Sequence, residues 1–278
     1  MLTRDARFQQ WQALLWNRTK RNRTGEFLIH GVRPLTLAVR HGWPLRAVLR
    51  PHGSSLSTWA TDMLATVRRS GTEVVEVAPD LLLELGEKSE EPPELIGVGE
   101  IQPDRLERIH FPPDGLVVVF DRPAYPGNIG TLVRSADAFG AGGVVVTGHA
   151  ADVYDPKTVR ASTGSLFAVP TIRLPSHHEV LAWVSTLRTD GIPVQVVGTD
   201  EDGDVDVDAA DLVGPIVVVV GNELRGMSAA WRDACDVIVR IPMRGTASSL
   251  NASVAASLVC YEADRQRRAS LARSAPPT

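Results

Sequence analysis

Six short apolar runs, rich in β-branched residues, recur between residues 116 and 243, and segments with helical periodicity separate them. The runs are LVVVF, GGVVVTG, FAVPTIRL, PVQVVGT, PIVVVVG and DVIVRIPM. Continuous apolar runs, unlike alternating apolar and polar residues, are typical of parallel strands that are buried on both faces. This part of the chain is therefore expected to be an α/β domain built on a parallel sheet.

The first part of the chain has a different pattern. An amphipathic helix is expected over residues 5–19, followed by a strand at RAVLR, another helix and a strand at TEVVEVA. This alternation predicts a small α/β layer domain, and a chain of 278 residues is long enough for two cores. The adjacent prolines Pro112 and Pro113 indicate a linker. We predict an N-terminal domain with its linker over residues 1–112, and a second domain over residues 113–278 that ends in a flexible tail, QRRASLARSAPPT.

Several classes of protein are disfavoured by composition. Cys235 and Cys260 have neither a CxxC spacing nor a companion pair of histidines, so they are expected to be reduced thiols. The N-terminus lacks the apolar run of a signal peptide, and no stretch approaches the roughly 20 apolar residues of a membrane span. The acidic stretch 200–211 lacks the order of a calcium loop and the seven histidines are scattered. We expect a cytoplasmic protein with no catalytic metal and no membrane partner.

Charge is distributed unevenly along the chain, although the net charge is only −4. Residues 1–50 contain ten Lys or Arg and two Asp or Glu, whereas residues 51–110 contain five and twelve. The stretch NRTKRNR at 17–23 holds four cations and follows Trp11 and Trp16. Cations beside aromatic rings suit phosphate contacts and base stacking, so RNA is the expected partner. A solvated helix end is the alternative interpretation of this stretch.

A second basic segment, YDPKTVRASTGS, lies in the other predicted domain. Arg160 in this segment is a candidate for a further phosphate contact, although Arg160 and Lys157 at helical spacing also fit a solvated helix face. The candidate RNA-binding residues are Arg18, Lys20, Arg21, Arg23 and Arg160.

Three loops share one design, in which a strand leads through a turn into a helix. In FDRPAYPGNIGTLVRSADAFG a strand ends in a Pro/Gly turn, and a helix then carries Asn128 and Arg134. GNELRGMS at 221–228 and IPMRGTASSLNASVAA at 241–256 repeat the arrangement. Open α/β sheets bind ligands outside such strand ends. No GxGxxG follows a strand and no Lys-Ser/Thr follows GNELRG, which disfavours dinucleotide and P-loop sites.

In this order, N-x-G-x-x-x-R, G-N-E-x-x-G and I-P-M-x-G-x-x-x-S-L-N resemble the SpoU/TrmH family of S-adenosylmethionine-dependent RNA ribose 2'-O-methyltransferases. The resemblance covers residues 116–268. It implies the SPOUT class of α/β fold, in which a parallel sheet contains a deep trefoil knot, preceded by a small ribosomal-protein-like α/β domain that binds RNA. It also implies a homodimer whose facing knots complete each site. Family members more often have Ser or Thr where Asn222 stands.

The loops that follow the apolar strands predict the cofactor site. Small and amide side chains at these strand ends let a cofactor approach the backbone closely. Ser249 and Asn251 are also expected to cap the helix that follows them. The candidate cofactor-binding residues for S-adenosylmethionine are Gly198, Thr199, Gly221, Asn222, Ile241, Met243, Ser249 and Leu250.

The candidate catalytic residues are Arg134, Asn128, Glu223 and Asn251. A guanidinium that grips the adjacent phosphate also stabilises charge that develops on the ribose oxygen, so we favour this role for Arg134. The resemblance leaves open that Arg134 is itself the base, and the proton acceptor is not assigned. Asn128 is expected to cap its helix and to orient Arg134 or the RNA. Glu223 is expected to bind the cofactor or a neighbouring arginine.

The expected activity is methylation of a ribose 2'-hydroxyl in RNA, and 23S ribosomal RNA is the favoured substrate. Three segments, ARFQQWQALL, GHAADVYDPKTVRASTGSLF and ASSLNA, resemble a family member that confers antibiotic resistance, which implies that role here. The alternatives are a transfer RNA 2'-O-methyltransferase, a non-catalytic RNA-binding protein with the same fold, and a methyltransferase for a small molecule or protein.

Overall fold

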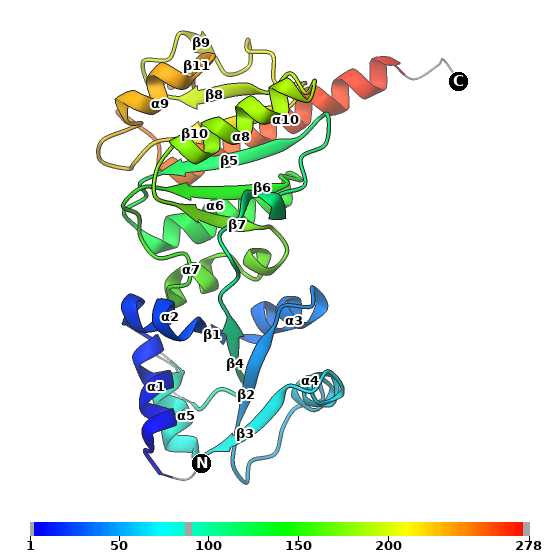
Figure 1. Cartoon of the computed structure of the whole chain (residues 1–278), viewed down its shortest axis with the longest axis vertical. Helices are drawn as coiled ribbons and strands as arrows, with labels where there is room; N and C mark the ends of the chain where they lie inside the picture. The colour runs from blue at the N-terminus through cyan, green and yellow to red at the C-terminus, as the bar shows by residue number, and fades with distance from the viewer. Residues whose placement is uncertain (1–2, 87–90, 275–278) are drawn as a thin grey trace. The chain divides into compact units, whose positions relative to one another are not determined.

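A computed structural model describes residues 3–86 and 91–274 of the chain. The chain divides into two compact units. Unit 1 comprises Met1–Pro103 and Asp152–Ala168, and unit 2 comprises Asp104–Ala151 and Val169–Thr278 (Figure 1). These units differ from the predicted division in two ways: the first boundary lies between Pro103 and Asp104 and not between residues 112 and 113, and the segment Asp152–Ala168 returns to unit 1.

Unit 1 is built on a four-stranded sheet in the order β1 (Glu26–His30), β4 (Ile96–Glu100), β2 (Leu45–Pro51) and β3 (Glu73–Val77). β4 is antiparallel to both of its neighbours, and β2 is parallel to β3. The sheet thus confirms a small α/β domain. Its helices are α1 (Ala6–Leu14), α2 (Arg18–Thr24), α3 (Val32–Arg40), α4 (Thr58–Arg69), α5 (Pro79–Leu85), α7 (Pro156–Ala161) and the short helix η2 (Ser165–Phe167).

The single helix predicted over residues 5–19 is two helices, α1 and α2. The break lies at Asn17, whose backbone is extended and whose side-chain oxygen accepts a hydrogen bond from the Lys20 amide at 2.9 Å. An Asn side chain that bonds the backbone in this way starts a new helix. The prediction of one continuous helix was therefore wrong at Asn17, because the hydrogen bond of its side chain outweighs the apolar pattern around it.

Unit 2 is built on a seven-stranded sheet in which every pairing of neighbouring strands is parallel. The order is β7 (Thr171–Leu174), β6 (Gly143–Thr147), β5 (Leu116–Asp121), β10 (Ile216–Val220), β8 (Gln195–Thr199), β11 (Val237–Arg240) and β9 (Val205–Asp206). All residues of β5, β6 and β10 are buried, as continuous β-branched runs require. Its helices are η1 (Leu106–Arg108), α6 (Pro126–Ala138), α8 (His178–Thr189), α9 (Ala229–Ala234) and α10 (Ala252–Ser274).

Each of the six apolar runs forms a strand, so the predicted parallel α/β sheet is confirmed. The trefoil knot stays a prediction. The tail predicted to be flexible from Gln266 is helical through Ser274, where α10 ends, and residues 275–278 lie outside the described residues. Gln266 and Arg267 anchor this part of α10 to the carbonyl oxygens of Ala210 and Gly214 at 3.0 and 2.8 Å, which explains its order.

No helix of the described residues is both long and apolar enough to cross a membrane. Nor do three His, Cys, Asp or Glu side chains of the described residues gather closely enough to hold a metal ion. Cys235 and Cys260 are free thiols, and burial raises the pKa of each to about 12. Both cysteines are therefore unreactive protonated thiols at neutral pH.

Candidate functional site

A cavity of about 400 Å³ lies at the carboxyl ends of three neighbouring strands, β10, β8 and β11. Thr199, Val220 and Val239 line it from the strand ends, and Ala252 and Ala255 line it from the start of α10. Its volume lies within the range of small-molecule sites, about 300–1,000 Å³. The position matches the rule that open α/β sheets bind ligands beyond the carboxyl ends of their strands.

Seven of the eight predicted cofactor-binding residues line this cavity. They are Thr199, Gly221, Asn222, Ile241, Met243, Ser249 and Leu250. The eighth, Gly198, is not a lining residue in the part of the chain that the structure describes. A Cβ at Gly198 would lie 2.7 Å from Cys235 Sγ and 2.8 Å from Met227 Cε, so its small size is needed for packing beside β8.

Charged residues that sequence analysis missed also line the cavity. Asp200 directly follows β8, and its largely buried carboxylate accepts a hydrogen bond from Arg232. Asp200 begins the acidic stretch that was interpreted as a solvated loop; that interpretation was wrong at Asp200, whereas Glu201 and Asp202 are exposed. The position of Asp200 right after a buried strand was the available signal. Among the described lining residues, the charged ones are Asp200, Glu201, Asp202, Glu223, Arg225 and Arg232.

The loop after β10 has a shape set by its own hydrogen bonds. The backbones of Asn222 and Gly226 pair in both directions, with N–O distances of 3.0 and 2.9 Å. The Asn222 side-chain oxygen accepts from the amides of Leu224 and Arg225 at 2.9 and 3.1 Å. A Cβ at Gly221 would lie 2.2 Å from backbone atoms of Gly226, so only glycine fits there. Asn222 and Gly221 thus build this wall of the cavity.

The end of β5 supports the same loop. Arg122 has a φ of 52°, a left-handed conformation that is uncommon outside glycine. Its guanidinium donates to the buried Asp121 carboxylate at 2.9 and 3.0 Å and to the Gly226 carbonyl at 3.2 Å. Asp121 also accepts from the Ser228 amide at 2.9 Å. Sequence analysis did not single out this pair, whose signal is an Asp-Arg sequence where a buried strand ends.

Three of the four catalytic candidates form one polar network beside the cavity. The Glu223 carboxylate accepts from the Ala124 amide at 2.9 Å and from Asn128 Nδ2 at 2.8 Å. Asn128 Oδ1 accepts from Asn251 Nδ2 at 3.1 Å. The network joins the loop after β10 to the first turns of α6 and α10, so it orients both helices at the edge of the cavity.

Asn128 and Asn251 were both predicted to cap helices, and only Asn251 does so. Asn128 is not the N-cap of α6, because Tyr125 occupies that position and Asn128 lies inside the first turn. Its side chain is directed to Glu223 instead. Asn251 does cap α10, because its Oδ1 accepts from the Ser253 amide at 2.9 Å.

Arg134 lies further along α6 and does not join this network. Its side chain is exposed, and it does not line the cavity of the described chain. Within residues 3–86 and 91–274 its guanidinium makes no hydrogen bond or ion pair. The structure therefore leaves this guanidinium accessible to a ligand, on the same helix as Asn128.

The candidate RNA-binding residues all lie in unit 1, but they differ in exposure. Arg18, Arg23 and Arg160 are exposed and Lys20 is half-buried. Arg21 is only 1% exposed and forms an ion pair with Asp152, so the prediction that it contacts RNA is wrong. Trp16 is 66% exposed and remains a candidate for base stacking, whereas Trp11 is buried.

Comparisons with known proteins agree on one family. Residues 115–261 match the model of the SpoU rRNA Methylase family, and residues 5–97 match the SpoU L30e-like domain. A 23S rRNA (uridine(2479)-2'-O)-methyltransferase from Streptomyces viridochromogenes is 58% identical over 95% of this chain and 91% of its own length.

Solved structures give the same result. The SpoU methyltransferase AviRb from Streptomyces viridochromogenes, in complex with the cofactor AdoMet, has a TM-score of 0.91 at 58% identity. That comparison covers 95% of this chain and 99% of AviRb. An AdoMet-bound rRNA methyltransferase from Sinorhizobium meliloti has a TM-score of 0.83 at 28% identity, over 96% of this chain and 98% of that one.

Proposed function

Because the chain belongs to the SpoU rRNA methylase family, we propose that it transfers the methyl group of S-adenosylmethionine to a ribose 2'-hydroxyl of 23S ribosomal RNA. The observation that carries this proposal is the cavity at the ends of β10, β8 and β11, which is lined by seven of the predicted cofactor-binding residues, six of them in the family motifs. We further propose that it acts in the cytoplasm, where its ribosomal RNA substrate is modified.

The residues of the cavity fit S-adenosylmethionine. This cofactor supplies an electrophilic methyl group on a cationic sulfur, and it also carries an ammonium and a carboxylate. Four carboxylates and two guanidiniums line the described cavity, a balance that favours a ligand with net positive charge. The loop at residues 221–226 also lines the cavity, and its own hydrogen bonds fix its shape. A ligand that binds there therefore does not have to order the loop, which favours affinity.

In methyl transfer the ribose oxygen forms a bond to carbon as the sulfur–carbon bond breaks, and the hydroxyl proton leaves. We propose that Arg134 binds the phosphate next to the target ribose and stabilises the negative charge that develops on its oxygen. Glu223, Asn128 and Asn251 are assigned as positioning residues, because their side chains bond to one another and to the start of α6 and α10. The acceptor of the proton is not assigned.

We propose that the protein is a homodimer that pairs through α6 and α10. These helices contact each other, since Ser257 Oγ donates to Ser135 Oγ at 2.6 Å and the rings of Phe139 and Tyr261 are 5.9 Å apart. An exposed apolar stripe at helical spacing runs along α10 and consists of Val254, Leu258 and Tyr261. A second copy would cover this stripe and place its own Arg134 beside the facing site. Sedimentation analysis of the native protein and of Leu258→Glu tests this, because the variant is expected to be a monomer.

The decisive experiment is transfer of label from methyl-tritiated S-adenosylmethionine to unmodified 23S ribosomal RNA, with transfer RNA as a parallel substrate. Alkaline hydrolysis follows, because a 2'-O-methyl group protects the adjacent phosphodiester. An alkali-resistant labelled dinucleotide from 23S ribosomal RNA is the expected product. Label in transfer RNA alone would show that transfer RNA, and not 23S ribosomal RNA, is the substrate. Cofactor binding without transfer to either RNA would favour a non-catalytic RNA-binding protein.

A role in antibiotic resistance is a second proposal, based on the 58% identity to the Streptomyces viridochromogenes enzyme. Methylation of the large ribosomal subunit would weaken the binding of an antibiotic to that subunit. A host that expresses this chain is expected to tolerate more of such an antibiotic than a host that expresses Arg134→Ala. Equal susceptibility of the two strains would contradict the proposal.

A further inference from the structure

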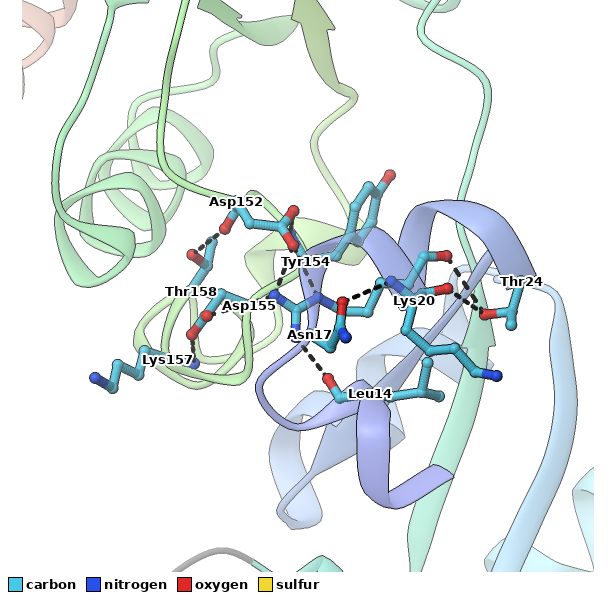
Figure 2. A network of polar contacts seen from close by, with 10 residues as sticks. Leu14, Asn17, Lys20, Thr24, Asp152, Tyr154, Asp155, Lys157 and Thr158 are labelled. Carbon is cyan, nitrogen blue, oxygen red and sulfur yellow. Dashed lines mark hydrogen bonds and ion pairs between the residues drawn. The ribbon is translucent and has the colours of Figure 1, made fainter. Parts of the chain in front are cut away.

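A buried ion pair links two segments of unit 1 that are 131 positions apart in sequence. Arg21 in α2 and Asp152, just before α7, are 1% and 5% exposed. Arg21 Nε and Nη2 lie 2.8 and 2.7 Å from Asp152 Oδ2 (Figure 2). The side chain of Arg21 thus points away from solvent, although it comes from the most basic stretch of the chain.

The guanidinium of Arg21 contacts three residues at once. Besides Asp152, its Nη2 lies 3.5 Å from Asp155 Oδ2, and its Nη1 donates to the Leu14 carbonyl at 2.6 Å. Leu14 ends α1, and the other Asp155 oxygen caps α7 by accepting from the Lys157 amide at 2.9 Å. A planar guanidinium with five donors meets such a set of acceptors, whereas a lysine ammonium does not have that fork geometry.

Asp152 is itself held in place by hydrogen bonds from its own segment. Its second oxygen accepts from the Tyr154 amide at 3.1 Å, and its carbonyl accepts from Thr158 Oγ at 2.9 Å. The hydrogen-bonded segment from Asp152 to Thr158 therefore presents a rigid acceptor to Arg21 (Figure 2). A buried pair of this kind adds little net stability compared with apolar residues, but it specifies which surfaces meet.

The surfaces that meet here both carry cations. Asn17 caps α2, and Asp155, which contacts Arg21, caps α7 (Figure 2). α2 contributes the exposed Arg18 and Arg23, and α7 contributes the exposed Lys157 and Arg160. The Arg21 contacts thus join two segments, distant in sequence, that each carry exposed cations suited to phosphate contacts.

We propose that α2 and α7 together form one phosphate-binding surface for the RNA substrate, and that Arg21 is the positioning residue that holds the two helices in register. This inference rests on the proposed function, because it assumes that the substrate is RNA. It assigns to RNA binding a segment that follows β6 of the methyltransferase unit in sequence but belongs to unit 1 in space. Arg21 itself makes no phosphate contact.

The first test measures binding of an unmodified 23S ribosomal RNA transcript over a series of salt concentrations. Lys157→Gln/Arg160→Gln removes the α7 cations, and Arg68→Gln/Arg69→Gln removes two exposed cations from α4 of the same unit as a matched control. The α7 variant is expected to lose about tenfold or more in affinity and about two from the slope of log K against log salt, as two lost phosphate contacts require. Equal binding by the α7 variant and its control would overturn the inference.

The second test separates positioning from direct contact. Arg21→Lys keeps the charge, so a phosphate contact would survive the change. The simultaneous contacts of the guanidinium with Leu14, Asp152 and Asp155 would not survive it. We expect RNA affinity to fall in Arg21→Lys, and the further effect of Lys157→Gln/Arg160→Gln in that background to be much smaller than in the native protein. Asp152→Asn, which leaves the cation of α2 intact, is expected to reproduce this non-additivity. Native affinity in both single variants, or additive effects in the combined ones, would refute the positioning role.

Cofactor binding is measured for every variant, because the cavity lies in unit 2. All of these variants are expected to bind S-adenosylmethionine like the native protein, which also shows that unit 2 is folded. If the native protein bound the cofactor but not the 23S transcript, the proposed function would fail. If the native protein bound the transcript and the α7 variant bound it equally well, only the present inference would fail.

Discussion

In each unit, a set of bonded polar side chains joins segments that are distant in sequence. We call each set a tie, and the two ties differ in burial. In unit 1, Arg21 and Asp152 form an ion pair whose side chains are only 1% and 5% exposed. In unit 2, Glu223, Asn128 and Asn251 are half-buried or exposed at the edge of the cavity. A buried charge is costly unless its partner is present, whereas an exposed network is partly replaced by water. The first tie is therefore expected to govern stability, and the second to govern activity.

The largest effect is expected from breaking the buried tie. Asp152→Ala leaves Arg21 without its main partner, which is expected to lower the free energy of unfolding by about 3–5 kcal/mol. Urea unfolding followed by tryptophan fluorescence measures this. The control is Glu73→Ala, whose partner Arg7 is exposed, and a loss of about 1 kcal/mol or less is expected there. Equal losses in the two variants would remove the distinction between buried and exposed ties.

Arg134→Ala is the opposite case, in which activity is lost and stability is kept. The side chain is exposed and unbonded within the described chain, so its removal is expected to change the free energy of unfolding by less than about 0.5 kcal/mol. Loss of charge stabilisation is expected to slow methyl transfer by about 100- to 1,000-fold, with cofactor affinity unchanged. Single-turnover transfer and equilibrium dialysis measure the two quantities, and unchanged transfer would remove Arg134 from the mechanism.

Asn128→Ala is expected to have an intermediate effect on activity. The change cuts the link between Glu223 and Asn251, so the first turns of α6 and α10 lose their common orientation. A misplacement of positioning residues is expected to lower kcat about tenfold or more with little change in KM for the cofactor. Asn128→Asp keeps the size but places a second carboxylate beside Glu223, and it should not restore activity. Full activity in both variants would show that the network only caps and packs.

The smallest of these effects is expected at an exposed pair and depends on pH. Arg7 donates a hydrogen bond to Glu73, and this bond holds the pKa of Glu73 below its usual value. A carboxyl whose pKa is lowered by folding contributes stability above its unfolded pKa and loses it as the pH falls through the folded value. Glu73→Gln is therefore expected to be slightly less stable than the native protein at pH 7 and equally stable at pH 2. A larger difference at pH 2 than at pH 7 would contradict this sign.

Much of unit 2 was predictable because its signals are local. The β-branched runs predicted the parallel strands, and the loops after them predicted the lining of the cavity. Asp200 was missed because its acidic neighbours mask its position at a strand end. The family resemblance itself, inferred from three motifs, is confirmed by the SpoU models and by the 58% identical relative.

Less of unit 1 was predictable because its features depend on distant partners. Arg21 is indistinguishable in sequence from Arg18 and Arg23, and only its pairing with Asp152 makes it a buried residue. The two segments are 131 positions apart, separated by the rest of the N-terminal sequence and by the start of the methyltransferase sequence, so no local pattern indicates that they meet. The break at Asn17 was also missed, since an N-cap asparagine inside a helical pattern looks like any polar residue on the exposed face.

The excursion of residues 152–168 into unit 1 has a consequence for chimeric enzymes. A graft that exchanges only the first 103 residues between relatives would bring a foreign Arg21 surface against the resident Asp152 segment. Such a chimera is expected to lose the buried ion pair wherever the foreign segment does not bring an arginine to Asp152. Because unit 1 is the proposed RNA-binding unit, we expect a transfer of RNA specificity to need residues 152–168 together with residues 1–103. Unit 1 is thus encoded by two separate stretches of the gene.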